Sequence, residues 1–399
     1  MIYAYGVINI LKTADTVIDY FYDPNWTDEE IDRINQTYDA VILPMADAFR
    51  VDYQKSLENY IKLIQKLKIA VVVIGIGLRA DYEPDISSGF QFDDVATRFI
   101  SAVLDKSAQI GLRGHITADY LKKLGFIEGT HYSAIGCPSL YTYGNGVTMK
   151  PVSSNIEHVA VNINDYYHIG HINDMFINTV NRFSDVYLVQ QIQAEFIDLF
   201  IGKRFPFSHH MKNIPDSILG DKYLELKKND RVRYFFDTIS WVNFLKRFDI
   251  FVGNRFHGSV AAILAGTPNI MFPFNARTRE MTEYHHLTCL RPDEVREGTS
   301  IIDYLDQLDF DSYESNKRAN LDHYIDFLNR NGLDETIFQD KLEWEQGESP
   351  LEKQIQEKMN TGIAEICSET VCFESLSRSK KWGRSLSCYG QVAKAIIKR

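Results

Sequence analysis

Short runs of β-branched residues alternate with amphipathic stretches until about Asp311, and this alternation constrains the fold more than any other feature of the sequence. Runs of four to eight such residues are typical of buried strands, whereas apolar residues three and four positions apart are typical of helices. Strands that alternate with helices form parallel sheets covered by helices, because each crossover must travel back along the sheet. The sequence therefore predicts an α/β fold.

The predicted elements fall into two groups separated by a glycine-, proline- and serine-rich break near residues 144–155. The first group has strands at Asp39–Pro44, Ile69–Gly75 and Ile110–Arg113, and helices at Tyr53–Leu67, Asp93–Lys106 and about Thr117–Leu124. The second has strands at His158–Asn162, Asp185–Val189, Tyr234–Phe236, Ile250–Val252 and Asn269–Phe272, and helices at His171–Phe183, Ser240–Arg247 and Gly258–Leu264. Beyond Asp311 we expect only helix, beginning with Asn316–Asn329.

This grouping predicts two Rossmann-like parallel-sheet domains that face a cleft, followed by a C-terminal helical extension. At roughly 150 residues per domain, a chain of 399 residues accommodates two domains and an appendage. We place the domains at residues 1–148 and 149–312, and the extension at residues 313–399. In open α/β sheets ligands bind outside the carboxyl ends of the strands, so we expect the active site in the cleft.

Composition excludes several classes of partner. The net charge of −11 argues against a general nucleic-acid binder, because the phosphate backbone would be repelled, although a local basic pocket could still bind a small anion. Five scattered cysteines are too few and too irregular for a disulfide framework or a zinc pair, which favours a reducing, cytoplasmic location. No apolar run approaches the roughly 18 to 20 residues that span a bilayer.

The segment from Gly253 to Pro268 carries the most chemical information. A buried strand ends at Gly253, Arg255 and His257 follow, and a helix of small residues begins at Gly258. The unpaired N–H groups and positive dipole end of such a helix attract an anion, an arginine adds a bidentate fork, and a histidine can supply a proton. The same residues could instead satisfy loop carbonyls beside a well-packed helix.

The segment resembles the signature of the polysaccharide pyruvyl transferase family, in which Arg-x-His-Gly is followed by a small-residue helix and Gly-x-Pro. Three further segments agree with the family in order and spacing, so that the resemblance covers about residues 1 to 310. They are Gly111–Thr117, Gly136–Leu140 and Asn275–Glu280.

The resemblance implies an enzyme on a fold like that of GT-B glycosyltransferases. The implied reaction transfers a pyruvyl group from phosphoenolpyruvate onto two hydroxyls of one hexose as a cyclic ketal, in capsule or exopolysaccharide synthesis, and releases phosphate. Phosphoenolpyruvate is a co-substrate, so the resemblance implies no cofactor and no metal. It implies that the donor contacts are Arg113, Arg255, the backbone of Phe256, His257 and Gly258, with His257 also the general acid.

The acceptor side departs from the family pattern. Lys12-Thr13-Ala14-Asp15 stands where the family has a glycine-rich loop ending in Gly-Asp. We assign Asp15 as the base on the acceptor side, against its alternative role as a helix N-cap. Arg279 and Glu280 are weaker candidates for donor or acceptor contacts, because exposed charge pairs usually only solvate a loop. Arg113 has the alternative of a surface arginine at a helix start.

Two other functions remain open from the sequence. A GT-B glycosyltransferase that uses a nucleotide sugar would share the fold and the anion-binding helix end, but no acidic ribose contact is recognisable. A non-catalytic scaffold of a polysaccharide assembly complex would be expected to lack the Arg255 and His257 pair, which is present.

Residues 377–399 differ from the rest of the chain, since they carry seven basic residues and no acidic one. Removing these seven charges from the net −11 leaves −18 on residues 1–376. Apolar residues lie among the cations at roughly helical spacing, a pattern suited to the surface of an anionic membrane. The segment could thus bring the enzyme to a polyprenyl-diphosphate-linked acceptor at the inner face of the membrane, or it could pack on the acidic body of the same chain.

Overall fold

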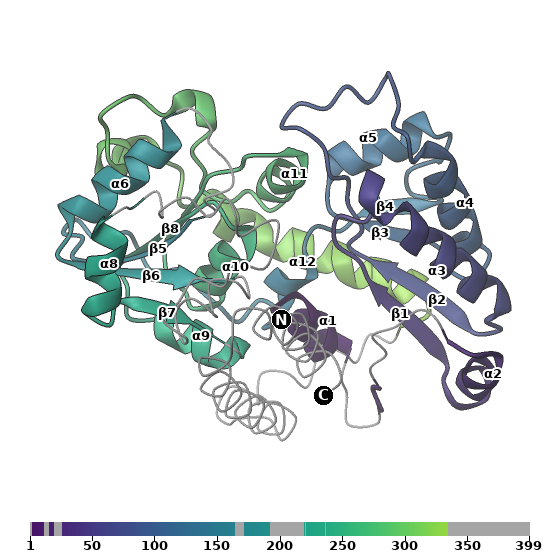
Figure 1. Ribbon diagram of the computed structural model, residues 1–399. Helices are drawn as coiled ribbons and strands as arrows, with labels where there is room; N and C mark the ends of the chain where they lie inside the picture. The colour runs from purple at the N-terminus through teal and green to yellow at the C-terminus, as the bar shows by residue number, and fades with distance from the viewer. Residues whose placement is uncertain are drawn as a thin grey trace, which may run out of the picture.

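The chain folds into two α/β domains, each built on parallel strands, which face each other with helix α12 passing between them in Figure 1. This confirms the predicted fold class. The computed structural model describes residues 2–11, 16–19, 26–163, 171–191, 219, 221–235 and 237–333. No helix in these ranges is both long and apolar enough to cross a membrane.

The first domain contains four short parallel strands and the helices that cover them. The strands are β1 (Ala40–Pro44), β2 (Ala70–Ile74), β3 (Ile110–Leu112) and β4 (Tyr132–Ala134), and the helices are α2 (Asp28–Thr37), α3 (Gln54–Lys66), α4 (Asp93–Leu104) and α5 (His115–Lys123). β1 pairs with β2 and β3 with β4, and a parallel bridge between Ile76 and Leu112 joins the two pairs. The four strands thus end on the same side of the domain.

The second domain contains a five-stranded parallel sheet in the order β7-β6-β5-β8-β9. Its strands are β5 (His158–Asn162), β6 (Asp185–Gln190), β7 (Val232–Tyr234), β8 (Ile250–Gly253) and β9 (Asn269–Met271). Its helices are α6 (Ile172–Arg182), α8 (Asp221–Lys228), α9 (Thr238–Leu245), α10 (Phe256–Leu264) and α11 (Ala276–Tyr284). Strand β5, at the centre, is buried from Val159 to Asn162 and apolar as far as Val161, as expected for a strand covered on both faces.

Two helices connect the domains. Helix α1 (Ile2–Leu11) packs on the short 3-10 turn at Pro138–Tyr141, close enough that a side chain at Gly6 would collide with the backbone of Ser139. Helix α12 (Ser312–Arg330) begins at the second domain and ends on the first, where Asn331 Oδ1 accepts hydrogen bonds from the N–H groups of Ala108 and Gln109. Its buried face packs against the sheet of the first domain.

Most predicted elements agree with the structure, and the differences have physical causes. The strand predicted at Tyr234–Phe236 lies two residues earlier, at Val232–Tyr234. Helices α1, α2, α8 and α11 and strand β4 were not predicted. For α11 the reason is visible in its sequence, ARTREMTEY, which has almost no apolar periodicity and is instead started by a capping box at Asn275.

Helix α12 should be essential to the stability of the first domain. Phe327 is buried against the first-domain sheet, so Phe327→Ala should lower the free energy of unfolding by about 3 to 5 kcal/mol. Ile127→Ala is the control, since Ile127 is 59% exposed and its loss should change stability by roughly 0.5 kcal/mol or less. Urea unfolding followed by circular dichroism measures both. Equal effects of the two substitutions would contradict the role assigned to α12.

Candidate active site

The candidate site is built from residues that follow the carboxyl ends of parallel strands in both domains. In the first domain Asp47, Arg79 and Arg113 follow β1, β2 and β3, and in the second His257 and Arg277 follow β8 and β9. Parallel strands place these ends at one edge of a sheet, which is where such folds bind ligands. The two edges meet, because Tyr3 of α1 contacts both Arg113 and His257.

His257, the predicted general acid, lies in the first turn of α10. Its ring stacks on that of Tyr3 with 6.3 Å between the centroids, and its Nε2 is buried without a hydrogen-bond partner among the described residues. Burial, together with the charges of Arg277 and Arg113, holds the pKa of His257 well below its usual 6.5. In the ligand-free protein the imidazole is therefore neutral at neutral pH.

The rest of the Arg-x-His-Gly segment shapes the start of α10. Arg255 is the N-cap residue, and its Nε donates a hydrogen bond to Ile163 O over 3.1 Å. Phe256 packs in the core of the second domain. Gly258 N–H donates to Arg255 O, and a side chain at this glycine would lie 2.7 Å from the ring of Phe251. The glycine thus lets α10 approach β8 closely, as its small size suggested.

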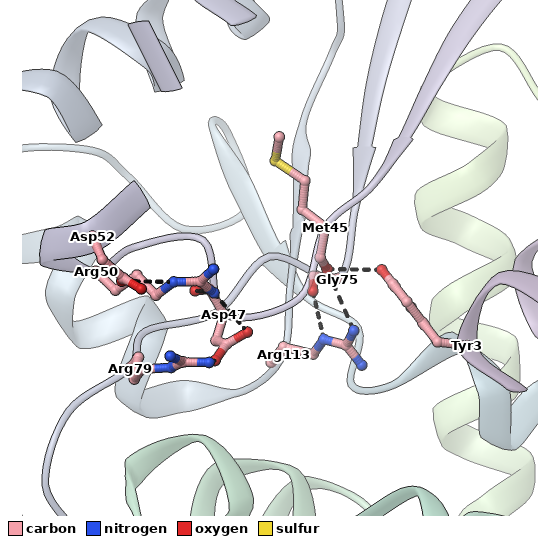
Figure 2. A network of polar contacts seen from close by, with 8 residues as sticks. All are labelled: Tyr3, Met45, Asp47, Arg50, Asp52, Gly75, Arg79 and Arg113. Carbon is pink, nitrogen blue, oxygen red and sulfur yellow. Dashed lines mark hydrogen bonds and ion pairs between the residues drawn. The ribbon is translucent and has the colours of Figure 1, made fainter. Parts of the chain in front are cut away.

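Arg113 is not the surface arginine that was its alternative reading, because its exposed fraction is 0%. Figure 2 shows its guanidinium beside the carbonyl oxygens of Met45 and Gly75, to which it donates, and Nη1 also contacts Cys137 Sγ. The guanidinium lies 4.2 Å from the centre of the Tyr3 ring. Arg113 therefore ties together the loops that follow β1 and β2 and lies near His257.

A second group of charges lies beside Arg113, as Figure 2 shows, and surrounds Asp47. Asp47 is buried and forms ion pairs with Arg50 at 3.1 Å and with Arg79. Against the effect of burial, Arg277, Arg79 and Arg50 hold the pKa of Asp47 below its usual value. A carboxylate held ionised in this way is a poor base, so its role here is electrostatic.

Arg277 acts electrostatically on both Asp47 and His257. Its Nε is buried and has no hydrogen-bond partner among the described residues, and burial lowers the pKa of its guanidinium. Its charge acts on Asp47 and on His257 more strongly than that of any other arginine. The site thus contains two buried nitrogens, Arg277 Nε and His257 Nε2, available to an anion.

Arg279 and Glu280, the weaker candidates for donor or acceptor contacts, are not the exposed charge pair on a loop that was their alternative interpretation. Both residues lie on α11, where Arg279 pairs with Glu283 and Glu280 is completely buried. Burial raises the pKa of Glu280 to about 8, although hydrogen bonds from Thr117 oppose this. Asp15, the predicted base, lies outside the described residues, so its position stays a prediction.

Four residues of the site were not among the predicted contacts, namely Tyr3, Asp47, Arg277 and Arg79, the last of which pairs with Asp47. Arg277 stands in a segment that matched the family pattern, which was the available signal. For Tyr3 and Asp47 the sequence offers none, because their roles depend on contacts across the fold.

The described residues form no metal site, and a cavity among them lies away from the candidate site. The described part of the chain contains no cluster of three or more His, Cys, Asp or Glu side chains that could bind a metal ion. His285 accepts a hydrogen bond from Cys137 N–H at 2.7 Å. A cavity of about 730 Å³ lies between the end of α11 and residues 286–312, and the predicted donor residues are all outside its lining.

The fold and site together define a two-domain α/β protein with a cationic site where the strand ends of both domains meet. The model of the polysaccharide pyruvyl transferase family matches residues 1–275, and the chain belongs to this family. No curated protein matches the chain.

Several solved structures are similar to the chain at low identity. An uncharacterised Klebsiella pneumoniae protein is 15% identical, covers 71% of this chain and 82% of its own, and has a TM-score of 0.39. UDP-GlcNAc 2-epimerase from Neisseria meningitidis, bound to UDP-GlcNAc, is 11% identical, the match covers 86% of this chain and 96% of that chain, and the TM-score is 0.42. Anabaena HepE in complex with UDP-glucose is 12% identical, the match covers 79% of this chain and 80% of that chain, and the TM-score is 0.40. At these scores none of the three bears on activity.

The two histidines His257 and His158 should titrate on opposite sides of pH 6.5. The pKa of His257 is lowered by burial, whereas a hydrogen bond to Asp185 raises that of His158. The stability that neutral His257 contributes is present above pH 6.5 and is lost as the pH falls toward its lower pKa. Nitrogen-15 NMR of the imidazoles between pH 5 and 8, with His257→Gln to assign the signal, measures this. A His257 signal that titrates near pH 6.5 would contradict the burial described above.

Proposed function

We propose that the protein transfers a pyruvyl group from phosphoenolpyruvate onto two hydroxyls of one hexose in a polysaccharide repeat-unit precursor, forming a cyclic ketal and releasing phosphate. Membership of the pyruvyl transferase family supports the class of reaction. The observation that carries the choice of donor is the pair of buried nitrogens, His257 Nε2 and Arg277 Nε, which have no partner among the described residues.

The charge of the site suits this small, strongly anionic donor. Buried cations without a full set of counter-ions are costly, and a bound phosphate or carboxylate would supply the missing negative charge. Arg277 would contact the anion through Nε, and Arg255 with the first N–H groups of α10 would contact it from the second domain. Arg113 would contribute its charge from the first domain and hold the loops around the donor.

His257 would then act as the general acid. Burial, together with the charges of Arg277 and Arg113, lowers the pKa of His257 and keeps the imidazole neutral. The negative charge of bound phosphoenolpyruvate would offset both arginines, raise the pKa of His257 and allow it to hold a proton. Protonating the methylene carbon of the donor makes C2 an electrophile, which the first sugar hydroxyl attacks as its proton passes to a base, for which we propose Asp15.

The second half of the reaction repeats this chemistry. Breaking the C–O bond to phosphate regenerates the electrophilic C2, and the leaving phosphate takes the electron pair. The second hydroxyl attacks and loses its proton, so that one donor and one diol give one ketal and one phosphate. No redox change occurs, and we propose that the enzyme requires no cofactor or metal for these steps.

The reaction predicts a clear pattern of activity. With phosphoenolpyruvate and an acceptor, released phosphate and a glycan that has gained a pyruvyl ketal should appear together, and His257→Ala or Arg255→Ala should abolish both without unfolding the protein. A panel of galactosyl, glucosyl and mannosyl glycosides, free and polyprenyl-diphosphate-linked, assayed by mass spectrometry and phosphate release, tests this. Turnover of UDP-sugars with no ketal product would overturn the proposal in favour of a glycosyltransferase.

We further propose that residues 377–399, which lie outside the described residues, bring the enzyme to a lipid-linked acceptor at the cytoplasmic face of the membrane. The seven basic residues should bind anionic lipid and release it at high salt. Co-sedimentation with vesicles of phosphatidylglycerol and phosphatidylethanolamine, comparing the full chain with one ending at Glu374, measures this. Equal binding of both chains would contradict the role of the segment.

A further inference from the structure

Helix α11 follows β9 and so belongs by sequence to the second domain, but it is hydrogen-bonded to the first. At its start, Ala276 N–H donates to the carbonyl oxygens of Ala80 and Asp81 at 3.2 and 3.1 Å. Just beyond its end, His285 Nε2 accepts from Cys137 N–H. Both ends of the helix are therefore fixed to loops of the first domain.

The middle of α11 is held by a buried carboxyl group. Glu280 Oε2 accepts a hydrogen bond from Thr117 N–H at 2.8 Å, and Glu280 Oε1 lies 2.8 Å from Thr117 Oγ1. Thr117 is the third residue of α5, so its N–H is one of the helix-start donors that have no partner within the helix. Glu280 thus caps a helix of the other domain, where the positive dipole end favours a carboxylate.

The first domain has a shaped surface for this residue. A side chain at Gly114 would lie 2.8 Å from Glu280 Cβ and 2.9 Å from its carbonyl oxygen. A side chain at Gly77 would lie 3.1 Å from Glu280 Oε1 and 2.9 Å from Arg113 Cγ. Only glycines allow the backbone of the first domain to approach α11 this closely.

We propose that Glu280 is a positioning residue, which fastens α11 to the start of α5 and thereby holds Arg277, one helical turn earlier, in the donor site. Residues three apart on a helix lie on the same face, so fixing Glu280 also fixes the direction of Arg277. The proposal rests on the proposed function for the role of Arg277.

The contact works in either protonation state. Ionised Glu280 accepts from the Thr117 hydroxyl, and protonated Glu280 can donate to the same oxygen. The charged groups that act on it are Arg113, from the first domain, and Arg277, on its own helix. With a pKa near 8, the carboxyl gains its charge as the pH rises through that value, which offsets the two arginines and should weaken anion binding.

Two measurements on the full chain separate positioning from simple stability. Hydrogen exchange of residues 276–285 and 115–120 reports the attachment of α11, and calorimetric titration with phosphoenolpyruvate reports the donor site. The variants are Glu280→Ala, Glu280→Gln, Arg277→Met and the Glu280→Ala, Arg277→Met double variant. Asp119→Asn is the control, since Asp119 is an exposed acidic residue of α5 within the exchange segment.

Glu280→Ala should speed exchange in both segments and weaken donor binding by on the order of 10-fold to 100-fold, as loss of supporting contacts does elsewhere. Glu280→Gln, which keeps the shape and the hydrogen bonds, should restore both and remove the weakening of binding above pH 8. The double variant should bind no more weakly than Arg277→Met, because Glu280 acts through Arg277. Asp119→Asn should resemble the wild type.

Unchanged exchange in Glu280→Ala would overturn the proposal, and so would losses that multiply in the double variant. If Glu280→Ala fails to fold, Thr117→Val decides, because it removes the hydroxyl that contacts Glu280 Oε1 and leaves the carboxyl group in place. Unchanged exchange of residues 276–285 in that variant would overturn the proposal. A wild-type protein that binds no phosphoenolpyruvate would refute the proposed donor. In that case the exchange data alone would still confirm or refute the attachment of α11 by Glu280.

Discussion

The burial of the Arg113 guanidinium is the constraint around which the site is organised. A charged group taken out of water is tolerated only if most of its donors find acceptors. Here the acceptors are the carbonyl oxygens of Met45 and Gly75 and the sulfur of Cys137, which come from three different loops. The ring of Tyr3 covers one face of the guanidinium. Satisfying one side chain therefore fixes the loops that follow β1 and β2 relative to the turn that leads out of the first domain.

The electrostatics of the site follow from that arrangement. Arg113 and Arg277 lie near His257, while the nearby carboxylate, Asp47, is already paired with Arg50 and Arg79. Burial and this local positive charge keep His257 neutral, and Arg277 Nε and His257 Nε2 have no partners among the described residues. The net charge of −11 is therefore a property of the whole surface and says nothing about this site, which is set by a few buried groups.

The sequence could predict what depends on local pattern and missed what depends on contacts across the fold. The alternation of strands and helices was sufficient for the five strands of the second domain and for three of the four in the first, and the motif around Arg255 and His257 located the start of α10. The alternative of an exposed charge pair fails for Glu280, because neighbours on a helix point about 100° apart, so that the Arg279 side chain is 29% exposed while Glu280 is buried. Helix α11 was missed because its packing surface is polar and leaves no apolar period.

Two independent parts of the structure determine where His257 and Arg277 lie. On one side, β8 and β9 pair in parallel with Gly253 opposite Met271, which fixes where the two loops leave the sheet. On the other, α11 is bonded to the first domain at both ends and at its centre. The link between β9 and α11 is short and is itself held, since Phe272 N–H donates to Gly253 O and Asn275 caps α11. Any separation of the domains must therefore break the contacts of α11 with the first domain or distort this link, and distortion of the link would move Arg277 relative to His257.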